Sequence, residues 1–183
     1  MFLAMGTGMT VAVWAEILPD TPAVISDLGN RTFAELNART NQVVRALRAL
    51  GLQAGDGVAL MCSNRAEYVE VYDATRRAGF RLTPINWHLT GAEAGYVVND
   101  CDAKAFVAEA RFADEAITAA GMAKGATVRL AIGGAIEGFA SYEAALAGQD
   151  GTNISDPSLG TSMLYTSGTT GRPKGVHRPA AAP

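Results

Sequence analysis

The fold is decided by residues 30–62, NRTFAELNARTNQVVRALRALGLQAGDGVALMC. Thr32 followed by Glu35 forms a capping-box pattern, which marks the start of a helix. Apolar side chains then recur three or four positions apart along one face, and Gly51 ends the pattern. Val58–Cys62 is a short, continuous apolar run, as expected of a strand that is buried on both faces. This stretch therefore predicts an amphipathic helix followed by an interior strand.

The remaining sequence repeats this alternation of short apolar runs and amphipathic segments. Asn64 with Glu67 resembles a second cap, and Thr90 with Glu93 a third. Pro84 confines its strand to a sheet edge or lies at a strand end. Further helices are expected at residues 64–77, 90–99, 111–120 and 142–147, and further strands at 23–26, 82–86, 105–107 and 127–132. Strands that alternate with helices at this spacing predict an α/β fold, in which helices flank a layered, largely parallel sheet.

Composition and charge exclude several classes of function. Of the 183 residues, 49% are hydrophobic and 18% are charged, which suits a sizeable core and not a disordered chain. The net charge is −3 and the basic residues are scattered, so neither nucleic acid nor an anionic membrane is an expected partner. Cys62 and Cys101 have no CxxC or histidine pairing, which gives no support for a disulfide or a zinc site. Without a signal peptide or a transmembrane run, we expect a cytoplasmic protein.

Residues 163–176, MLYTSGTTGRPKGV, carry the clearest chemical pattern. They follow a polar segment at residues 148–160 that has the composition of a linker. Glycines let a backbone approach a ligand closely, and successive N–H groups can then surround an anion. Serine and threonine hydroxyls can donate to phosphate oxygens or coordinate magnesium, and Lys174 adds a mobile positive charge. The pattern therefore predicts a loop that binds polyphosphate.

Two familiar phosphate motifs are excluded by the order of the residues. A Walker A loop needs G-x-x-x-x-G-K-[ST], whereas Gly171 is followed by Arg-Pro-Lys-Gly, and the glycines do not follow G-x-G-x-x-G. An ordinary flexible loop is the plain alternative, because glycine, serine and threonine are common in loops. The order YTSGTTGRPKG favours a phosphate-binding loop over an ordinary flexible loop, since it resembles, nearly letter for letter, the signature phosphate loop of the adenylate-forming (AMP-binding) enzymes.

That family includes acyl-CoA synthetases, peptide-synthetase adenylation domains and beetle luciferases. The resemblance extends over about residues 10–179. Residues 19–60 look like the usual opening of the ligases in this family, and residues 64–100 look like the stretch that follows. The segments PINWHL at 84–89 and GVHRP at 175–179 favour the fatty-acyl-CoA synthetase branch.

The resemblance implies a ligase that first joins ATP and a carboxylic acid into an acyl-adenylate and then transfers the acyl group to coenzyme A. Matched to the family motif, the residues that would hold the ATP phosphates are Thr166, Ser167, Gly168, Thr169, Thr170, Gly171 and Lys174. Thr166 would also lie near Mg²⁺, and Lys174 would neutralise the departing pyrophosphate. No catalytic residue is assigned within this chain.

The resemblance also implies that residues 1–183 are an incomplete N-terminal portion of the large adenylate-forming domain. The family's segments for adenine, ribose and the acyl group, and its small C-terminal domain, have no counterpart in this sequence. Three functions therefore compete: an acyl-CoA ligase completed by further sequence, a non-catalytic truncated or split-gene product that acts through a complementing chain, and a stand-alone nucleotide binder. We expect the isolated chain to be inactive.

Several other polar and aromatic residues are expected to be structural. His88 has no acidic or nucleophilic partner in a recognisable pattern, which favours a polar loop residue over a general base. Trp14 and Trp87 are expected to pack against the core. Asp100 and Asp102 lie at an expected helix end, where carboxylates are usually solvated.

Overall fold

The computed structural model of the chain describes residues 4, 6–166 and 173–177. Its strands are β1 (Pro22–Val24), β2 (Arg31–Thr32), β3 (Gly57–Met61), β4 (Arg81–Pro84), β5 (Ala103–Glu109), β6 (Val128–Ile132), β7 (Ala140–Ser141), β8 (Thr161–Thr166) and β9 (Lys174–His177). Its helices are α2 (Thr10–Ile17), α3 (Phe33–Ala49), α4 (Ala66–Arg77), α5 (Gly91–Asp100), α6 (Ala113–Met122) and α7 (Tyr142–Leu146), with a short 3-10 helix η1 (Ala110–Phe112).

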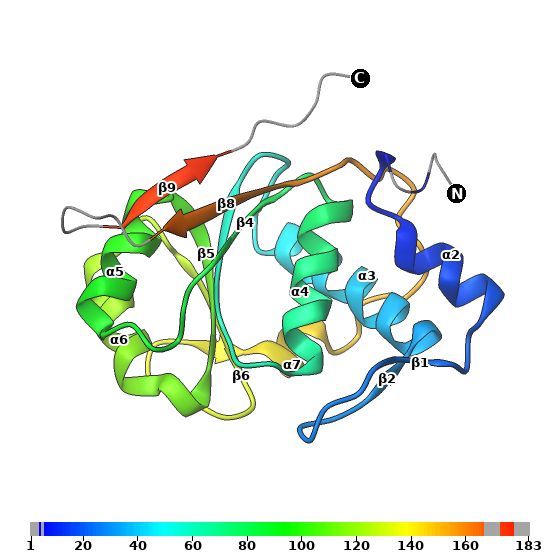
Figure 1. Cartoon of the computed structure of the whole chain (residues 1–183), viewed down its shortest axis with the longest axis horizontal. Coiled ribbons are helices and arrows are strands. Elements are labelled where there is room, and N and C mark those ends of the chain that lie inside the picture. Colours follow the sequence, from blue (N-terminus) through cyan, green and yellow to red (C-terminus); the bar gives the residue numbers. More distant parts are fainter. Residues whose placement is uncertain (1–3, 5, 167–172, 178–183) are drawn as a thin grey trace.

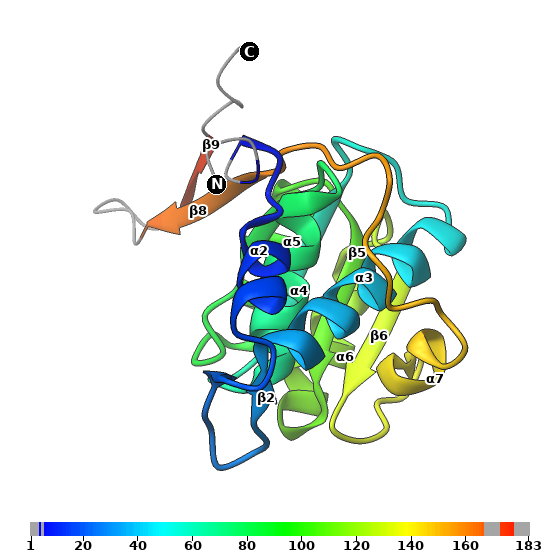
Figure 2. The same cartoon turned by 90° about the vertical axis from the view of Figure 1, so that its right-hand side faces the viewer.

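These elements form a two-stranded ribbon, β1-β2, and a seven-stranded sheet in the order β7-β6-β5-β3-β4-β8-β9. Neighbours in the larger sheet are parallel except for β8 and β9. Figure 1 shows α5 and α6 on one side of the sheet and α3 and α4 on the other. Figure 2 shows α2 packed beside α3. The predicted α/β fold, a largely parallel sheet with flanking helices, is confirmed.

The central strand β3 supplies side chains to both cores. All five of its residues are buried. Val58 and Leu60 pack in the core that includes residues of α3 and α4, whereas Ala59 and Met61 pack in the core that includes residues of α5 and α6. Because side chains of a strand alternate between the two faces, one short apolar run can fill both layers. The interior strand predicted at Val58–Cys62 is therefore confirmed.

Two of the three predicted caps form. The Thr32 hydroxyl accepts a hydrogen bond from the Glu35 N–H at 3.2 Å, and the Glu35 carboxylate accepts one from the Thr32 N–H at 2.8 Å. Thr90 and Glu93 make the same reciprocal pair at the start of α5. Gly51 follows the end of α3 with a φ of +94°, a conformation that favours glycine.

The predicted cap at Asn64 is wrong. Arg65 is the residue that precedes α4, and no side chain caps the first turn of this helix. Glu67 instead accepts two hydrogen bonds from the Arg65 guanidinium, at 2.7 and 2.8 Å. A bidentate, charge-assisted pair is stronger than a hydrogen bond from an uncharged donor, so the Glu67 carboxylate binds the Arg65 guanidinium and does not cap the helix.

The bounds of β4 and β5 differ from the prediction for physical reasons. β4 ends at Pro84, two residues earlier than expected, and the proline lies at the strand end as its missing N–H requires. β5 extends over Ala103–Glu109, because it pairs along its length with β3 on one side and β6 on the other. Tertiary pairing therefore lengthens a strand whose own sequence signal is short.

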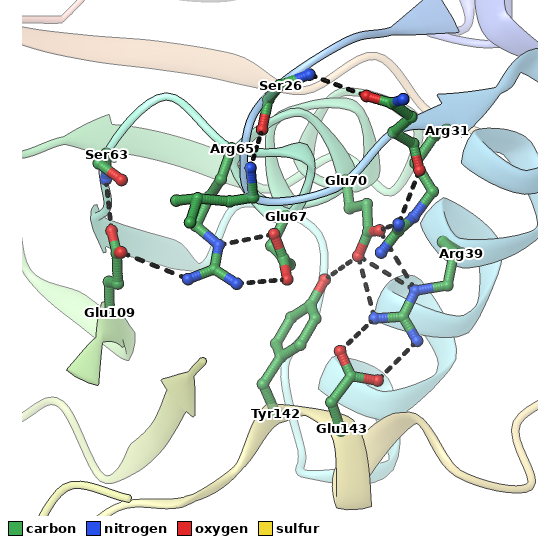
Figure 3. Close-up of polar contacts among 12 residues, drawn as sticks. Ser26, Arg31, Arg39, Ser63, Arg65, Glu67, Glu70, Glu109, Tyr142 and Glu143 are labelled. Atoms are coloured by element: carbon green, nitrogen blue, oxygen red, sulfur yellow. Dashed lines mark hydrogen bonds and ion pairs between the residues drawn. The ribbon is translucent and has the colours of Figure 1, made fainter. Parts of the chain in front are cut away.

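A fully buried carboxylate joins α4 to three other elements. Glu70 accepts hydrogen bonds from Arg31 Nε at 2.9 Å, from Arg39 Nε at 3.2 Å and from the Tyr142 hydroxyl at 2.8 Å, as Figure 3 shows. Arg39 also pairs with the exposed carboxylate of Glu143. A buried charge is tolerated only when it is paired and hydrogen-bonded, so these contacts fix α4 relative to β2, α3 and α7.

Neutralising Glu70 is expected to destabilise the chain strongly. Glu70→Gln keeps the size of the side chain but leaves Arg31 and Arg39 without their buried counter-charge, which should lower the free energy of unfolding by about 3 kcal/mol. Urea denaturation followed by circular dichroism measures this change. The matched control Glu143→Gln alters a side chain that is 60% exposed, and it should cost at most about 1 kcal/mol. Equal losses in the two variants would contradict the assigned role of Glu70.

Candidate functional site

The predicted phosphate-binding segment, residues 163–176, begins and ends in the two strands of a hairpin. β8 and β9 pair antiparallel, with Tyr165 opposite Gly175 and Thr166 opposite Lys174. Residues 163–165 are the apolar end of the strand that enters the loop, whereas the strand that leaves it has no such signal in the sequence. The pairing places the hydroxyl residue Thr166 beside the cationic residue Lys174, and both residues are exposed.

Only these two of the seven predicted phosphate-binding residues belong to the described part of the chain. The other five, Ser167, Gly168, Thr169, Thr170 and Gly171, lie outside the described residues. The hairpin therefore defines where the loop begins and ends. The phosphate-binding roles of all seven residues stay predictions.

Thr166 is also the residue expected near magnesium. Its hydroxyl is an oxygen donor of the kind that Mg²⁺ prefers. Within the described ranges, no group of three or more histidine, cysteine, aspartate or glutamate side chains could hold a metal ion. Mg²⁺ in phosphate-transfer sites usually takes few protein oxygens and completes its shell with water and substrate phosphates. Thr166 therefore fits as one ligand that acts together with a bound polyphosphate.

A cavity of about 460 Å³ opens beside the hairpin. Thr166 and Pro173 line it on the hairpin side, and Asn64 and Trp87 line it from the segments that follow β3 and β4. Those two segments lead into α4 and α5, which lie on opposite faces of the sheet (Figure 1). In open α/β sheets, ligands bind in the crevice where such connections diverge at the carboxyl ends of the strands. The predicted phosphate loop therefore borders the place where this fold type binds ligands.

Arg65 organises the same edge of the sheet. Its guanidinium contacts Glu67 at 2.7 Å and Glu109 at 3.3 Å, and the second oxygen of Glu109 accepts a hydrogen bond from the Ser63 N–H at 2.9 Å (Figure 3). Burial tends to raise the pKa of Glu67, but the hydrogen bonds and charge of Arg65 outweigh it and hold that pKa below its usual value. The network fixes the segment that carries Asn64 into the cavity.

Sequence reasoning missed this network. Arg65 and Glu109 are 44 residues apart, and no local pattern connects them. The one sequence feature that could have indicated it is that Arg65 follows an apolar strand and Glu109 ends another. The carboxyl ends of neighbouring parallel strands meet at one edge of a sheet, so two such residues can lie close together. The neighbour relation of β3 and β5 had to be known first.

The two cysteines are small, buried hydrophobic residues. Cys62 borders the cavity but is only 4% exposed, and Cys101 is 1% exposed. Burial, reinforced by the negative charge of Glu109, raises the pKa of the Cys62 thiol to about 12. Burial also raises the pKa of Cys101. Because the thiolate is the nucleophilic form, neither side chain is suited to covalent chemistry near neutral pH.

The aromatic residues near the cavity pack against one another. The Trp87 ring stacks on Phe112 with centroids 5.2 Å apart, and the exposed His88 ring lies 3.5 Å from that of Trp87. The backbone N–H of His88 donates to the Asn86 side chain, as in a tight loop. Trp14 contacts Phe33 at 6.1 Å. These contacts agree with the structural roles expected for Trp87 and His88, whereas Trp14 contacts the half-buried Phe33 and is not part of either core cluster.

Residues 11–182 match the family described as AMP-binding enzyme. A fatty acid–[acyl-carrier-protein] ligase, ScoC, from Streptomyces coeruleorubidus is 32% identical over 168 residues, which cover 91% of this chain and 31% of that protein. A medium/long-chain-fatty-acid–CoA/3-oxocholest-4-en-26-oate–CoA ligase from Mycobacterium tuberculosis (strain H37Rv) is 30% identical over 184 residues, which cover 94% of this chain and 34% of that protein. The chain spans about a third of the length of the curated relatives it matches.

The fold has counterparts among solved structures. The crystal structure of the anthranilate CoA ligase AuaEII in complex with anthranoyl-AMP superposes with a TM-score of 0.87 at 26% sequence identity. The superposition covers 94% of this chain and 34% of that one. The whole described fold thus corresponds to one part of a larger protein architecture.

The thiol chemistry of Cys62 can be measured directly. With its pKa near 12 instead of 9.0, about a thousandfold less thiolate is present at pH 8. The Cys101→Ala variant leaves Cys62 as the cysteine that can react. In its folded state this variant should therefore react with Ellman's reagent at least a hundredfold more slowly than in urea, where the Cys62 thiol is exposed. Because the folded-state pKa is raised, the thiol contributes stability below about pH 9 that is lost as the pH rises towards 12. Rapid native reaction at pH 8 would contradict the burial of Cys62.

Proposed function

Because the chain belongs to the AMP-binding enzymes, we propose that it forms the phosphate-binding side of the active site of an ATP-dependent acyl-CoA ligase. The observation that carries this proposal is the register of the β8–β9 hairpin, which sets Thr166 opposite Lys174 on the two sides of the loop. A hydroxyl donor and a mobile cation then flank the position expected for a polyphosphate. The neighbouring cavity at the carboxyl ends of β3 and β4 offers space for the rest of the ligand.

The proposed reaction has two steps. A carboxylate oxygen attacks the α-phosphorus of ATP, the bond to the β-phosphate breaks, and pyrophosphate leaves an acyl-adenylate behind. The thiol of coenzyme A then gives up its proton to solvent and its sulfur attacks the acyl carbon. The bond from that carbon to the phosphate oxygen of AMP breaks, so AMP departs and a thioester is formed. In the first step Thr166, residues 167–171 and Lys174 would hold the β- and γ-phosphates, and Thr166 would also be a ligand of Mg²⁺, which would neutralise phosphate charge. Lys174 offsets the charge that develops on the departing pyrophosphate, a form of electrostatic stabilisation.

A carboxylic acid is the proposed substrate, and a fatty acid is the first choice. The relatives from Streptomyces and Mycobacterium support this choice, since the names of both enzymes specify a fatty acid. The same names give two acceptor thiols, an acyl-carrier protein and coenzyme A. We propose coenzyme A, because the match to residues 84–89 and 175–179 favours the acyl-CoA synthetases.

We further propose that the 183 residues alone are inactive. The chain corresponds to about a third of its relatives, so groups that hold adenine, ribose and the acyl chain would come from further sequence or from a complementing chain. None of the helices among the described residues combines the length and the apolar composition that a membrane-spanning helix needs. The cytoplasm, which supplies ATP and coenzyme A, is the proposed location.

ATP–pyrophosphate exchange with a panel of carboxylic acids tests the ligase proposal. The isolated chain is expected to give no exchange, whereas a longer product of the same locus, or the chain combined with its complement, should exchange label with at least one fatty acid. Exchange follows the adenylation step and does not need an acceptor thiol. Lack of exchange with every acid in the longer form would overturn the proposal.

Substitution of Lys174 tests the assigned charge. In the active form, Lys174→Ala should lower the exchange rate about 10²-fold, the usual cost of removing one group that stabilises developing charge. Lys124→Ala is the matched control, because Lys124 is also an exposed lysine but lies beyond the end of α6. Equal rates in the Lys174→Ala and Lys124→Ala variants would show that Lys174 does not act on the phosphates.

A further inference from the structure

The outer half of the β8–β9 hairpin has little support from the sheet. β8 pairs with β4 only at Thr161 and Ser162. From Met163 onwards, its strand partner among the described residues is β9, which lies at the edge of the sheet. Figure 2 shows this part of the hairpin extending beyond the layers of helices. An isolated two-stranded ribbon is only marginally stable, so side-chain contacts must hold it in place.

Tyr165 makes the decisive contact. Met163 and Tyr165 pack against the core on the α5 side, whereas Leu164 and Val176 are 55% and 48% exposed. The Tyr165 hydroxyl donates a hydrogen bond of 2.6 Å to Asp100 Oδ2. Such a short bond to a carboxylate is stronger than a neutral one. Burial, and then this hydrogen bond, raises the pKa of Tyr165 far above its usual value, so the hydroxyl keeps the proton that it donates.

Asp100 is itself firmly placed. It is the last residue of α5, and the carbonyl of the next residue, Cys101, accepts a 2.6 Å hydrogen bond from Arg81 at the start of β4. A carboxylate at the C-terminus of a helix is disfavoured by the helix dipole, and the last turn of α5 has no basic residue to offset it. Helix stability therefore does not explain Asp100. Asp100 and Asp102 are exposed, as expected of a solvated helix end, but the Asp100 carboxylate also has a specific donor 65 residues away.

The returning strand rests on the same ring. Gly175 pairs with Tyr165 across the hairpin. A Cβ atom at position 175 would come within 3.0 Å of Tyr165 Cζ and 3.1 Å of its hydroxyl, and it would overlap the end of Met163. The absence of a side chain at Gly175 thus lets β9 lie directly on the side chains of Met163 and Tyr165. Both strands of the hairpin therefore contact the Tyr165 ring.

We propose that Asp100 is a positioning residue for the phosphate loop, which it holds through Tyr165 and Gly175; this inference rests on the function proposed above. Asp100 fixes Tyr165, whose neighbour Thr166 leads into the loop. The same ring fixes Gly175, whose neighbour Lys174 leads out of it. Donors in a binding site must be held to within about 0.5 Å, and this clamp, Asp100–Tyr165–Gly175, connects the loop to the fixed end of α5.

Hydrogen–deuterium exchange of the full chain tests the clamp without a ligand. Tyr165→Phe and Asp100→Ala should each speed exchange of the β8 and β9 amides about tenfold or more, the effect of losing one hydrogen bond to a charged group. The β3 amides should not change. Asp100→Asn keeps an oxygen acceptor and should restore most of the protection, which a general effect on α5 would not do. Tyr72→Phe removes a more exposed hydroxyl, on α4, and is the matched control. Unchanged hairpin exchange in both Tyr165→Phe and Asp100→Ala would overturn the proposal.

Gly175→Ala tests the second half of the clamp. It should speed exchange of the hairpin amides as Tyr165→Phe does. The double variant should be little worse than either single variant, because both changes act on one contact and such effects are not additive. Fully additive effects would separate Gly175 from the clamp and overturn that part of the proposal.

Titration with Mg²⁺–pyrophosphate, followed by NMR, separates the clamp from the proposed function. Pyrophosphate is the part of the ligand that the loop would hold by itself. If the wild-type chain binds it and Tyr165→Phe raises the Kd about tenfold, both proposals are supported. A wild-type chain without saturable binding counts against the proposed function, and hydrogen exchange then decides the clamp alone. Faster exchange with an unchanged Kd would show a contact that does not position the loop, and would overturn the proposal.

Discussion

Burial of β3 on both faces is the constraint on which the rest of the structure depends. A strand whose five residues are all buried must lie inside the sheet, with a neighbour on each side and helices above and below. Full burial of a side chain such as Val58, Leu60 or Met61 contributes roughly 1.5–3 kcal/mol, so an edge position for this strand would be costly. Because β4 and β5 flank β3, the connections after β3 and β4 lead to opposite faces. The crevice beside the hairpin is a consequence of that arrangement.

Charged residues fix the orientation of α4, which apolar packing alone does not determine. The helix α4 follows β3 and could rotate or slide on an apolar surface at little cost. Arg65 and Glu67 tie its first turn to Glu109 at the end of β5, and Glu70 ties its next turn to Arg31 and Arg39. Buried charges of this kind add little net stability compared with apolar residues, but an unpaired one is strongly unfavourable. The pairs therefore select one orientation of α4, which in turn places the segment that borders the cavity.

Features that depend on neighbouring residues, such as helix caps, were predictable from the sequence. Contacts between residues that are far apart in the sequence were not. Thr32 and Glu35 lie three residues apart, so their capping box follows from the backbone geometry of a helix start. The same pattern at Asn64 and Glu67 does not form a cap. Arg65, which also contacts Glu109 at the end of β5, binds the Glu67 carboxylate instead. The ordered loop motif predicts a phosphate site, yet neither β9 nor the partner of Tyr165 has a local signal in the sequence. A pairing over 65 residues requires the sheet order, and a single sequence does not contain it in readable form.

The loop motif and the hairpin that presents it solve different physical problems. Glycine, serine and threonine provide many small donors, but a chain rich in these residues loses much conformational entropy when it is ordered around a ligand. Ligand affinity increases when the flanking structure already orders the loop, because less conformational entropy is then lost on binding. Two ladder pairs with β4 are weak support for this purpose, whereas a short hydrogen bond from Tyr165 to Asp100 anchors the strand within one residue of the loop. The carboxylate is unfavourable for α5 itself, and a fold of this kind can tolerate such a local cost where it holds a binding site in place. The position of Asp100 is therefore best understood from the loop, not from the helix that carries it.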